Sequence, residues 1–313
     1  MLRGRLAPSP TGAQHLGNAR TFLLAWLSIR RRGGQIGLRI EDLDSPRVKP
    51  GAAEQLADEL TWLGLDWDGP ITIQTQRLPL YAAALAKLQE RELVYPCTCT
   101  RSDIEQAASA PHAEHEPPFY PGTCAGRRVA DAAGLDRPFA WRFRSQARDW
   151  TYDDGFAGKT TVPRGLLGDF VVWKNNNTPA YQLAVVVDDA DQGVTEVVRG
   201  NDLVSSTPRQ LMLYEALGWT PPHFFHVPLV VGPDGRRLAK RHGDVRLASL
   251  RAAGVSPDWV RGFLAWSCGW LSEPEPLSMS AILALMDWRR IPLSQFILYP
   301  EQVEKLLATV KKC

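Results

Sequence analysis

The pattern of apolar and polar positions predicts a mixed α/β protein that begins with a short strand and a long helix. Residues 4–7 form a short apolar run that ends in turn formers at 8–12. From His15 onward, apolar residues recur at helical spacing up to the glycine pair at 33–34. A strand, a turn and a helix N-terminus in this order direct backbone N–H groups and the positive end of the helix dipole toward an anion.

The rest of the chain alternates between predicted strands and helices. Residues 35–40 are predicted as a buried strand, followed by amphipathic helices at 51–63 and 78–91. The β-branched run at 181–189 predicts a strand that resumes the sheet, and further strands are predicted at 194–198 and 224–231, on either side of a helix at 206–217. Beyond Asp244 the pattern predicts four helices, at 248–253, 257–266, 278–286 and 300–310. Their large aromatic residues are expected to form the core of a small helical subdomain: Trp259, Phe263, Trp266 and Trp270.

Residues 139–172 alternate charged and aromatic side chains, which predicts short strands joined by Gly and Asp turns. Interleaved arginines and aromatic rings can hold RNA by charge and stacking. Half-buried strands produce the same pattern, and for any single residue this second interpretation is favoured. The residues concerned are Trp141, Arg142, Phe143, Arg144, Trp150, Tyr152 and Phe156.

Composition narrows the class of protein. The 313 residues include 44% apolar and 22% charged residues and carry a net charge of +2, which is typical of a globular protein and permits a nucleic-acid partner without requiring one. No apolar run approaches the length of a membrane span, and the motif that begins at Arg5 leaves no room for a signal peptide ahead of it. An odd number of cysteines, five, argues against a disulfide framework and for a reducing cytoplasm.

Three cysteines lie in one loop-rich stretch, at Cys97, Cys99 and Cys124. Thiolates in this number predict a tetrahedral site for a soft divalent ion, with zinc the expected ion in the cytoplasm. The alternative is three buried cysteines that act as small apolar residues. A histidine is the first choice on chemical grounds for the fourth ligand, which the spacing leaves open among His112, His115 and Tyr120.

Charged residues follow the predicted strands. Glu41, Asp42 and Asp44 come directly after the strand at 35–40, and Arg199 ends the strand at 194–198. The carboxyl ends of parallel strands are where open α/β sheets bind ligands. For Asp42 and Asp44, a solvated acidic turn is an equally good interpretation. A basic loop containing Lys240 follows the strand at 224–231.

Taken together and in order, these stretches resemble the catalytic half of a class I glutamyl-tRNA synthetase. The segment His15-Leu-Gly-Asn18 stands at the family's HIGH motif, and Arg237-Leu-Ala-Lys240-Arg241 stands at its KMSKS motif. The resemblance implies a Rossmann-like doubly wound parallel sheet with an inserted zinc-binding lobe and a small C-terminal helical subdomain. The expected division is a catalytic domain at 1–95 and 180–244, an inserted zinc-binding and RNA-contacting lobe at 96–179, and a helical stem-contact-like subdomain at 245–313.

The resemblance also implies roles for individual residues. His15 and Lys240 are expected to be catalytic, and ATP, with Mg²⁺, is expected to contact His15, Gly17, Asn18 and Lys240. Arginine forks can pair with a carboxylate, and the two expected here for glutamate are Arg5 and Arg199. The ammonium end is assigned to Ser9 and Glu41, with Tyr181 bridging. The remaining glutamate-site residues belong to the first strand and turn: Leu6, Ala7 and Pro8.

Two positions depart from the family's motifs. Asn18 replaces the second histidine of HIGH, and Ala239 replaces the serine of KMSKS. Asn18 can still donate a hydrogen bond, so the first departure is mild. The second removes one loop hydroxyl and bears on the rate of the reaction.

The cysteine pattern and the short C-terminal part resemble a shorter branch of the family. The Cys-x-Cys…Tyr-x-x-x-Cys pattern is similar to the zinc site of these relatives, so Tyr120 is adopted as the fourth ligand of one structural zinc ion, with His115 in reserve. Residues 241–313 are too few for the large anticodon-binding half of a full synthetase. The chain therefore resembles the glutamyl-queuosine tRNA(Asp) synthetase family.

That resemblance implies that glutamate is activated with ATP and transferred to the queuosine base at the wobble position of tRNA(Asp), whose anticodon stem-loop the catalytic lobe would hold. A monomer in the cytoplasm is expected. Two alternatives stay open: a short glutamyl-tRNA synthetase that charges a tRNA 3′ end, and a non-catalytic RNA- or protein-binding module. The complete set of expected site residues argues against the binding module: Arg5, His15, Glu41, Arg199 and Lys240.

Overall fold

A parallel sheet forms the centre of the computed structural model, which describes residues 1–10, 13–43, 48, 50–107, 120–146, 148–238 and 245–312. β1 (Arg3–Leu6) pairs in parallel with β2 (Gln35–Ile40), which pairs in parallel with β3 (Thr72–Ile73). β9 (Glu196–Gly200) and β10 (His223–Val227) form a second parallel pair. Thr195 N–H donates to the Arg3 carbonyl over 2.8 Å, so β9 lies next to β1. The predicted first strand is confirmed with a shift of one residue, and β2 is confirmed at both ends.

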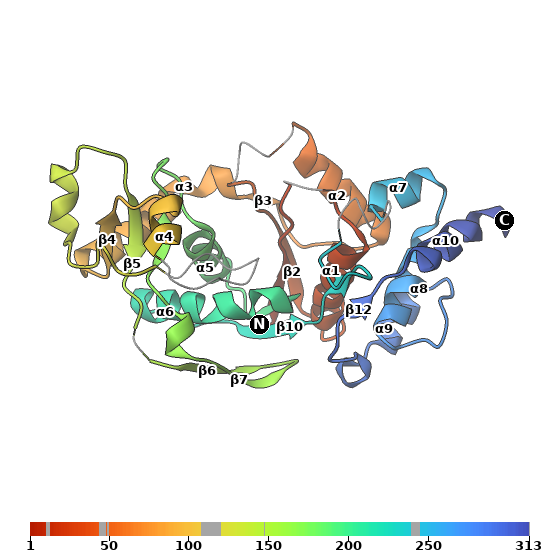
Figure 1. The fold of residues 1–313 in the computed structure, drawn as a ribbon. Coiled ribbons are helices and arrows are strands. Elements are labelled where there is room, and N and C mark those ends of the chain that lie inside the picture. Colours follow the sequence, from red (N-terminus) through yellow and green to blue (C-terminus); the bar gives the residue numbers. More distant parts are fainter. Residues whose placement is uncertain are drawn as a thin grey trace.

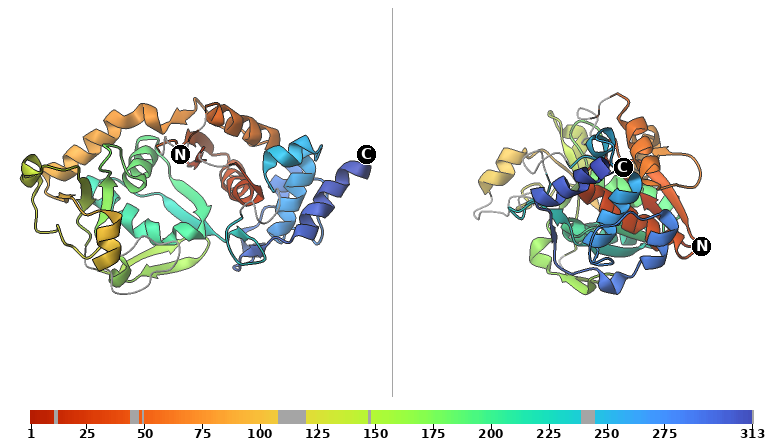
Figure 2. Two further views of the ribbon diagram at one scale, coloured as in Figure 1. Left: turned by 45° about the horizontal axis from the view of Figure 1, so that its top comes forward. Right: turned by 90° about the vertical axis from the view of Figure 1, so that its right-hand side faces the viewer.

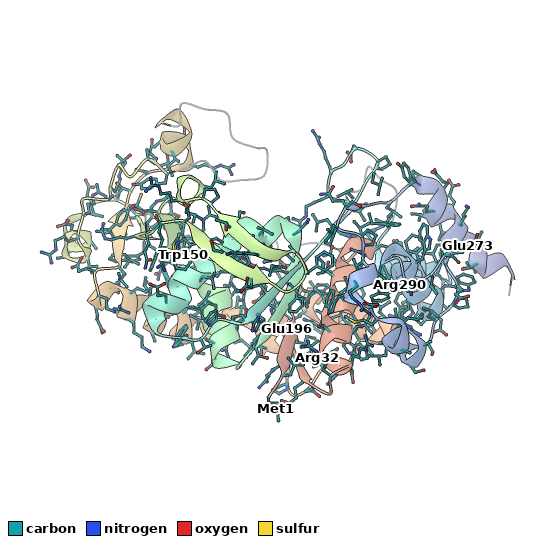
Figure 3. All side chains as sticks on the ribbon, turned by 90° about the horizontal axis from the view of Figure 1, so that it is seen from below. Met1, Arg32, Trp150, Glu196, Glu273 and Arg290 are labelled. Atoms are coloured by element: carbon teal, nitrogen blue, oxygen red, sulfur yellow. The ribbon has the colours of Figure 1, made fainter. Side chains whose placement is uncertain are left out.

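α1 (Leu16–Arg30) crosses from β1 to β2 and is buried over most of its circumference. It lies in one hydrophobic core together with β1, β2, α2 (Ala52–Leu63) and the C-terminal helices, which explains why apolar residues occur on more than one of its faces (Figure 1). At its C-terminal end, Arg32 Nη2 lies 2.5 Å from Glu196 Oε2, so that this end of the helix is joined to the start of β9 (Figure 3).

Residues 181–191 form a helix, α5 (Tyr181–Asp191), where the β-branched composition predicts a strand. Val185, Val186 and Val187 are each at most 4% exposed, because α5 is packed in a second core with α3 (Leu78–Glu90), α6 (Thr207–Leu217) and β8 (Phe170–Trp173). A short continuous apolar run does not distinguish a buried strand from a buried helix, and here tertiary packing outweighs β propensity. The strand prediction for this segment is therefore wrong.

The predicted strand at 224–231 is also divided. β10 ends at Val227, and β11 (Val230–Val231) pairs with β12 (Phe296–Ile297) in a separate parallel ribbon. Pro228 separates them and has no N–H with which to continue the ladder. Its carbonyl accepts a 2.6 Å hydrogen bond from the buried guanidinium of Arg20 on α1.

An antiparallel lobe extends from the sheet at one end of the molecule. β4 (Val94–Cys97) pairs with β5 (Ala140–Phe143), which pairs with β8. β6 (Trp150–Asp154) and β7 (Gly158–Val162) form a hairpin, and α4 (Arg101–Ala107) follows the first two cysteines. The short strands predicted within 139–172 are confirmed. Figure 2 shows this lobe and the C-terminal helices at opposite ends of an arch.

Four helices close the chain: α7 (Leu247–Ala252), α8 (Pro257–Ser267), α9 (Met279–Leu285) and α10 (Pro300–Ala308). All four were predicted within two residues at each end. Phe263 and Trp270 are 2% exposed, and Trp259 and Trp266 pack against the same core partly buried, as expected. Short 3-10 helices occur at Gln74–Arg77, Val129–Gly134, Arg164–Leu166, Asn201–Ser206, Trp288–Arg290 and Thr309–Lys312. No helix in the described part of the chain is long and apolar enough to cross a membrane.

Candidate active site and metal centre

His15 is the N-cap residue of α1. Its Nδ1 atom accepts hydrogen bonds from the backbone N–H groups of Gly17 (3.1 Å) and Asn18 (3.3 Å). Burial, together with the positive charge of Arg237, lowers the pKa of His15 to about 4, so the ring is neutral at neutral pH. Because Nδ1 is an acceptor, the proton of the neutral ring is on Nε2, where it can donate to an anion at this helix terminus.

Gly17 makes this cap possible. A Cβ atom at Gly17 would lie 3.0 Å from Cε1 of the His15 ring and 3.4 Å from Cβ of Val230. The contact with the ring is tighter than ordinary van der Waals contact, so the ring would have to shift by a few tenths of an ångström. The glycine of the His-x-Gly motif therefore allows the imidazole to fold back over the first turn of α1.

The basic loop begins and ends close to this helix terminus. On one side, β11 continues into a turn in which Val231 bridges to Arg237. On the other side, Leu16 N–H donates to the carbonyl of Val245 over 3.1 Å, and His15 forms a bridge with Arg246. Both flanks of the KMSKS-like segment thus adjoin the HIGH-like segment. Lys240 itself lies outside the described residues, as does Ala239.

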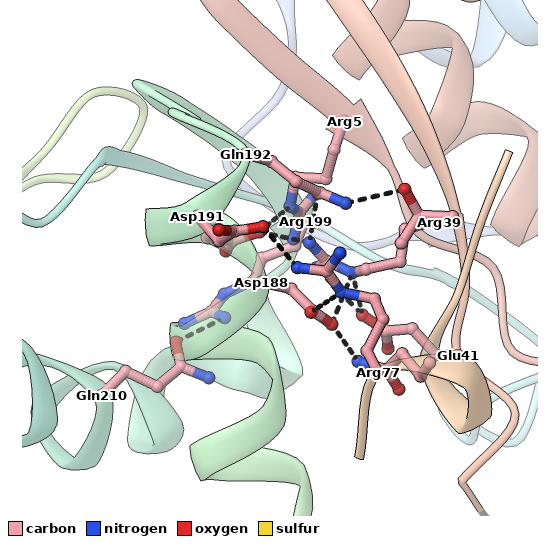
Figure 4. A network of polar contacts seen from close by, with 12 residues as sticks. Arg5, Arg39, Glu41, Arg77, Asp188, Asp191, Gln192, Arg199 and Gln210 are labelled. Atoms are coloured by element: carbon pink, nitrogen blue, oxygen red, sulfur yellow. Dashed lines mark hydrogen bonds and ion pairs between the residues drawn. The ribbon is translucent and has the colours of Figure 1, made fainter. Parts of the chain in front are cut away.

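A fully buried guanidinium, that of Arg39, organises the carboxylates at the end of the sheet (Figure 4). Its Nη1 atom lies 2.6 Å from Asp189 Oδ1, and its Nη2 atom lies 3.1 Å from Glu41 Oε1. Arg5, from β1, approaches the same Asp189 oxygen to 3.6 Å and donates to the carbonyl of Val198 over 3.3 Å. Burial raises the pKa of Glu41, against the opposing effect of both arginines. The network places one half-buried carboxylate, Glu41, between two cations.

Asp188 extends this network on its other side. Both of its oxygens accept from the hydroxyl of Tyr81, and its Oδ2 accepts from Gln74 over 2.8 Å. Arg77 Nε lies 2.7 Å from Oδ1. Asp188 is fully buried with these partners, so it supports the fold of this region and has little free capacity for a ligand.

Arg199 is different, because its hydrogen-bond partners among the described residues are all uncharged. It is 4% exposed, and it donates from Nε to His226 Nε2 (3.0 Å), from Nη1 to Gln210 Oε1 (2.8 Å) and from Nη2 to Thr207 Oγ1 (2.8 Å). Burial lowers its pKa, and the nearby cation Arg5 acts in the same direction. Among the described residues, two of its five N–H groups have no partner and no carboxylate lies within ion-pair distance. A buried cation without a counter-ion is the electrostatic signature of an anion site.

The remaining residues assigned to glutamate lie on the first strand and at the start of α5. Leu6 is fully buried and Ala7 half-buried, and the carbonyl of Pro8 accepts a 3.0 Å hydrogen bond from Glu41 N–H. Ser9 is exposed. Tyr181 is the first residue of α5 and is 37% exposed. The structure therefore brings the turn after β1 next to Glu41, and both lie in the region of Arg5.

Asp42 has a structural partner. Its two oxygens accept from the backbone N–H (2.9 Å) and the hydroxyl (2.6 Å) of Thr75, so it fixes the turn after β3. Of the two interpretations of Asp42, this geometry favours the exposed structural turn. Asp44 lies outside the described residues.

The three cysteines of the lobe converge on one point. Their sulfur atoms all lie within 4.8 Å of one another, and Cys99 Sγ is 3.6 Å from Cys124 Sγ. The hydroxyl of Tyr120 lies 3.4 Å from Cys97 Sγ and 3.9 Å from Cys99 Sγ. Sulfur ligands at about 2.3 Å from a tetrahedral zinc ion are separated by about 3.8 Å. These spacings fit a four-ligand site, and His112 and His115 lie outside the described residues.

The surroundings of this cluster favour the anionic form of one ligand, Cys124, whereas burial raises the pKa of Cys99 to about 11. Arg142 is buried, donates from Nε to Cys97 Sγ over 3.2 Å, and places its guanidinium 3.9 Å from the centre of the Tyr120 ring. Burial opposes ionisation of Cys124, but hydrogen bonds from the Thr98 backbone and from Tyr120 outweigh it and lower the Cys124 pKa to about 7. A thiol that ionises near neutral pH is a ready metal ligand.

Two other arginines of the lobe have structural partners. Arg144 donates to the carbonyls of Ala125 (2.6 Å) and Arg127 (2.5 Å) and lies 4.6 Å from the centre of the Tyr95 ring. Arg148 pairs with Glu215 at the surface. For Arg144 this geometry favours the structural interpretation, and nothing in the geometry of either arginine directs it toward RNA.

Sequence reasoning did not assign roles to several residues of the site. Arg39 lies within the strand predicted at 35–40, and Asp188 and Asp189 end the run at 181–189 for which a strand was predicted. His226 is the Cα partner of Arg199 in the parallel register of β9 and β10, a relationship that no local pattern reveals. The residues in question are Arg39, Asp154, Asp188, Asp189, Thr207, Gln210 and His226.

Comparisons with known proteins identify the family and the fold of the chain. Residues 1–275 match the family model described as tRNA synthetases class I (E and Q), catalytic domain. The Glutamyl-Q tRNA(Asp) synthetase of Rhodopirellula baltica is 54% identical over 277 residues, which cover 85% of this chain and 84% of that protein. The protein of the same name from Symbiobacterium thermophilum is 50% identical over 307 residues, 93% of this chain and 94% of that protein.

Among solved structures, a glutamate tRNA ligase from Elizabethkingia meningosepticum in complex with its amino acid aligns with a TM-score of 0.82 and 27% identity, over 97% of this chain and 68% of that one. This likeness confirms the expected class I α/β fold. The sequence relatives confirm the resemblance to the shorter branch of the family. The chain belongs to the class I glutamyl- and glutaminyl-tRNA synthetase family and, within it, to the Glutamyl-Q tRNA(Asp) synthetases.

Proposed function

We propose that this chain activates L-glutamate with ATP and transfers it to the queuosine base at the wobble position of tRNA(Asp). The observation that carries the proposal is Arg199, a buried cation with three uncharged partners and free N–H groups, on the strand next to β1. Such a group needs an anionic ligand, and the side-chain carboxylate of glutamate meets that need. The uncharged amide of glutamine would leave the cation unpaired, so the site is expected to reject it.

The other end of the amino acid would face the turn after β1. Arg5 supplies a second guanidinium, and Glu41 and Ser9 hold the ammonium group, with Tyr181 bridging. The backbone of the first strand and turn borders the pocket at Leu6, Ala7 and Pro8. Support comes from the contact between the Pro8 carbonyl and Glu41 N–H, which draws the turn and the carboxylate together.

In the first step, an α-carboxylate oxygen of glutamate attacks the α-phosphorus of ATP, and the bond to pyrophosphate breaks. The protein's task is to orient two anions and to stabilise the added charge. His15 Nε2–H and the N-terminus of α1 are suited to a phosphate, with Gly17 and Asn18 at the nucleotide. Lys240 is proposed to supply a further cation, and Mg²⁺ would arrive with ATP. In the second step, a hydroxyl of the queuosine ring attacks the activated carbonyl, and AMP leaves.

The cysteine cluster is proposed to bind one structural zinc ion through Cys97, Cys99, Cys124 and Tyr120. The sulfur and hydroxyl separations are those of a tetrahedral set, and four protein ligands leave no open position for catalysis. The ion would hold the start of α4 against the loop before β5. His115 remains the reserve ligand.

For the RNA, we propose the anticodon stem-loop of tRNA(Asp) as the partner. The division into a catalytic domain (1–95 and 180–244), a lobe (96–179) and a helical subdomain (245–313) stays a prediction, as do the monomeric state and the cytoplasmic location. The alternative of a short glutamyl-tRNA synthetase shares the same activation chemistry and differs only in the acceptor.

The acceptor distinguishes the two functions. The test measures incorporation of labelled glutamate into tRNA(Asp) that carries queuosine and lacks its 3′-terminal adenosine. Undiminished incorporation is expected, together with none into the same tRNA with guanine at the wobble position. Incorporation that disappears with the 3′ adenosine would instead establish the charging of a 3′ end. Absence of glutamate-dependent pyrophosphate exchange would leave only the binding module.

A further inference from the structure

The hairpin β6–β7 reaches from the lobe to the strand that adjoins Arg199. Gly155 N–H donates to the carbonyl of Phe224 over 2.8 Å, and a Cβ atom at Gly155 would lie 2.3 Å from the ring of Phe225. A larger residue at this position would have to displace the Phe225 ring. Phe156 contacts the ring of Trp288 at 6.1 Å between centroids, so the tip of the hairpin also touches the C-terminal part of the molecule.

This contact places the carboxylate of Asp154 in the interior of the protein. Asp154, the last residue of β6, is 4% exposed. Its Oδ1 accepts from the backbone N–H groups of Phe156 (2.9 Å) and His226 (3.2 Å), and its Oδ2 lies 2.5 Å from Nδ1 of His226. Its pKa is lowered: burial acts in the opposite direction, but the hydrogen bond with His226 and those from the backbone outweigh it. Asp154 is thus a carboxylate.

The hydrogen bonds fix the tautomer of His226. Arg199 Nε can only donate, and it lies 3.0 Å from His226 Nε2, so this nitrogen must be the acceptor. The ring proton is then on Nδ1, where it donates to Asp154. The three side chains form one chain of donors and acceptors: carboxylate, neutral imidazole, guanidinium.

We propose that His226 and Asp154 are positioning residues for Arg199, through which the hairpin of the lobe completes the glutamate site. The neutral imidazole holds the guanidinium by its Nε–H, while Gln210 and Thr207 each take one N–H from the other two nitrogens. This leaves the two remaining N–H groups for the substrate's carboxylate. The inference rests on the proposed function, because it takes Arg199 as the residue that binds glutamate.

The proposal also predicts that glutamate binding depends on pH. Protonation of His226 would place a proton on Nε2 and set two cations 3.0 Å apart. The charged or titratable groups that face His226 are Asp154 from the hairpin, Arg199 from β9, Asp202 from the Asn201–Ser206 turn, and Tyr152 from β6. Burial lowers the His226 pKa, and Arg199 adds to this effect against the two carboxylates. The chain of hydrogen bonds from Asp154 through His226 to Arg199 is therefore intact at neutral pH and is broken in acid.

The experiment compares two substitutions of His226 in glutamate-dependent ATP–pyrophosphate exchange. In His226→Gln, the amide oxygen reaches the position of Nε2 and can accept from Arg199 without titrating. In His226→Asn, the shorter side chain occupies the position of Nδ1 and leaves Arg199 Nε without a partner. We expect His226→Asn to raise the KM for glutamate at least about tenfold with the KM for ATP unchanged, and His226→Gln to stay within about threefold of wild type.

The pH profile supplies a readout that a purely structural role would not change. The KM for glutamate of the wild type should rise as the pH is lowered from neutrality into the acid range, and that of His226→Gln should rise less. Independently of activity, ¹⁵N NMR of histidine-labelled protein should find His226 as the Nδ1–H tautomer at pH 7.

Three results would overturn the proposal: the Nε2–H tautomer for His226, equal loss in His226→Gln and His226→Asn, or a change confined to the melting temperature. Failure of the proposed function is distinguishable, because it would appear in the wild type as no glutamate-dependent exchange, with the tautomer of His226 still measurable.

Discussion

Arg39 on β2 and Asp189 on α5 form a buried ion pair, with Nη1 and Oδ1 2.6 Å apart. The pair joins the first half of the sheet to a helix that follows it by some 150 positions, and Arg5 approaches the same carboxylate. The carboxylate therefore compensates two guanidinium groups at once, one of them without any solvent exposure. Asp189 of α5 is therefore the shared counter-ion of the two arginines that lie beside Glu41.

Asp189→Asn should destabilise the fold strongly. The amide keeps the shape but removes the charge that both arginines face, and breaking a buried pair in this way costs about 3 kcal/mol of unfolding free energy. Asp191→Asn is the matched control, because its carboxylate is 51% exposed and pairs with Arg77, a surface pair worth at most about 1 kcal/mol. Urea denaturation at pH 7 measures both. Equal effects in the two variants would show that the buried pair has no special weight.

Removal of one cysteine should release the metal. Cys99→Ser is expected to reduce zinc from about one ion per chain to a small fraction of that, and to lower the melting temperature of the lobe. Metal content by atomic emission and a thermal scan check this.

Tyr120→Phe and His115→Ala distinguish the fourth ligand. The hydroxyl of Tyr120 lies among the sulfur atoms, so its loss should weaken zinc affinity in a chelator competition by at least about tenfold. His115→Ala should leave the affinity unchanged. The reverse pattern would make His115 the ligand.

Lys240→Ala should slow adenylate formation by roughly two orders of magnitude or more, because a cation that stabilises charge in the transition state is removed. The affinity for glutamate should change little. Lys305→Ala, an exposed lysine on α10, serves as the control. If pyrophosphate exchange in Lys240→Ala equals that of the control, Lys240 has no role in catalysis.

Arg199→Leu should abolish glutamate activation while the far-ultraviolet circular dichroism spectrum is retained. The fork that pairs with the side-chain carboxylate is lost, and leucine offers no donor. Arg148→Leu, which removes an exposed arginine from the lobe, should retain wild-type exchange. A preserved preference for glutamate over glutamine in Arg199→Leu would assign selectivity to Arg5 instead.

Local pattern predicted much of the fold and the chemistry of single residues. The strand at 35–40 and the helix behind His15 follow from periodicity and caps, and Arg199 was identified by its place at a strand end. The pattern failed where the environment decides: the valines of α5 are buried on all sides, and Pro228 interrupts an otherwise apolar run. The partners of Arg199 could not be predicted from the sequence for another reason. Asp154 is 72 positions from His226, so only the folded chain brings them together.

The lowered pKa of His15 predicts that the free energy of unfolding decreases in acid. Its pKa is lowered to about 4 in the folded state, against 6.5 for an unperturbed histidine. Above pH 6.5 the ring is neutral in both states, so the cap contributes fully. As the pH falls from 6.5 toward 4, the unfolded chain binds a proton that the folded chain excludes, and stability is lost. Between pH 7.5 and 4.5 this single group should cost about 2 kcal/mol of unfolding free energy.

The substitution His15→Asn isolates that contribution. Asparagine is a good N-cap acceptor and does not titrate, so the first turn of α1 keeps its cap while the proton linkage disappears. Urea denaturation measures the unfolding free energy of both proteins at pH 7.5 and 4.5. Subtracting the loss in His15→Asn from the loss in the wild type cancels the contribution of all other titrating groups. The wild type should lose about 2 kcal/mol more than His15→Asn over this range. An equal loss in both proteins would mean that His15 binds its proton as readily in the folded state as in the unfolded chain, which its two acceptor hydrogen bonds at Nδ1 do not allow.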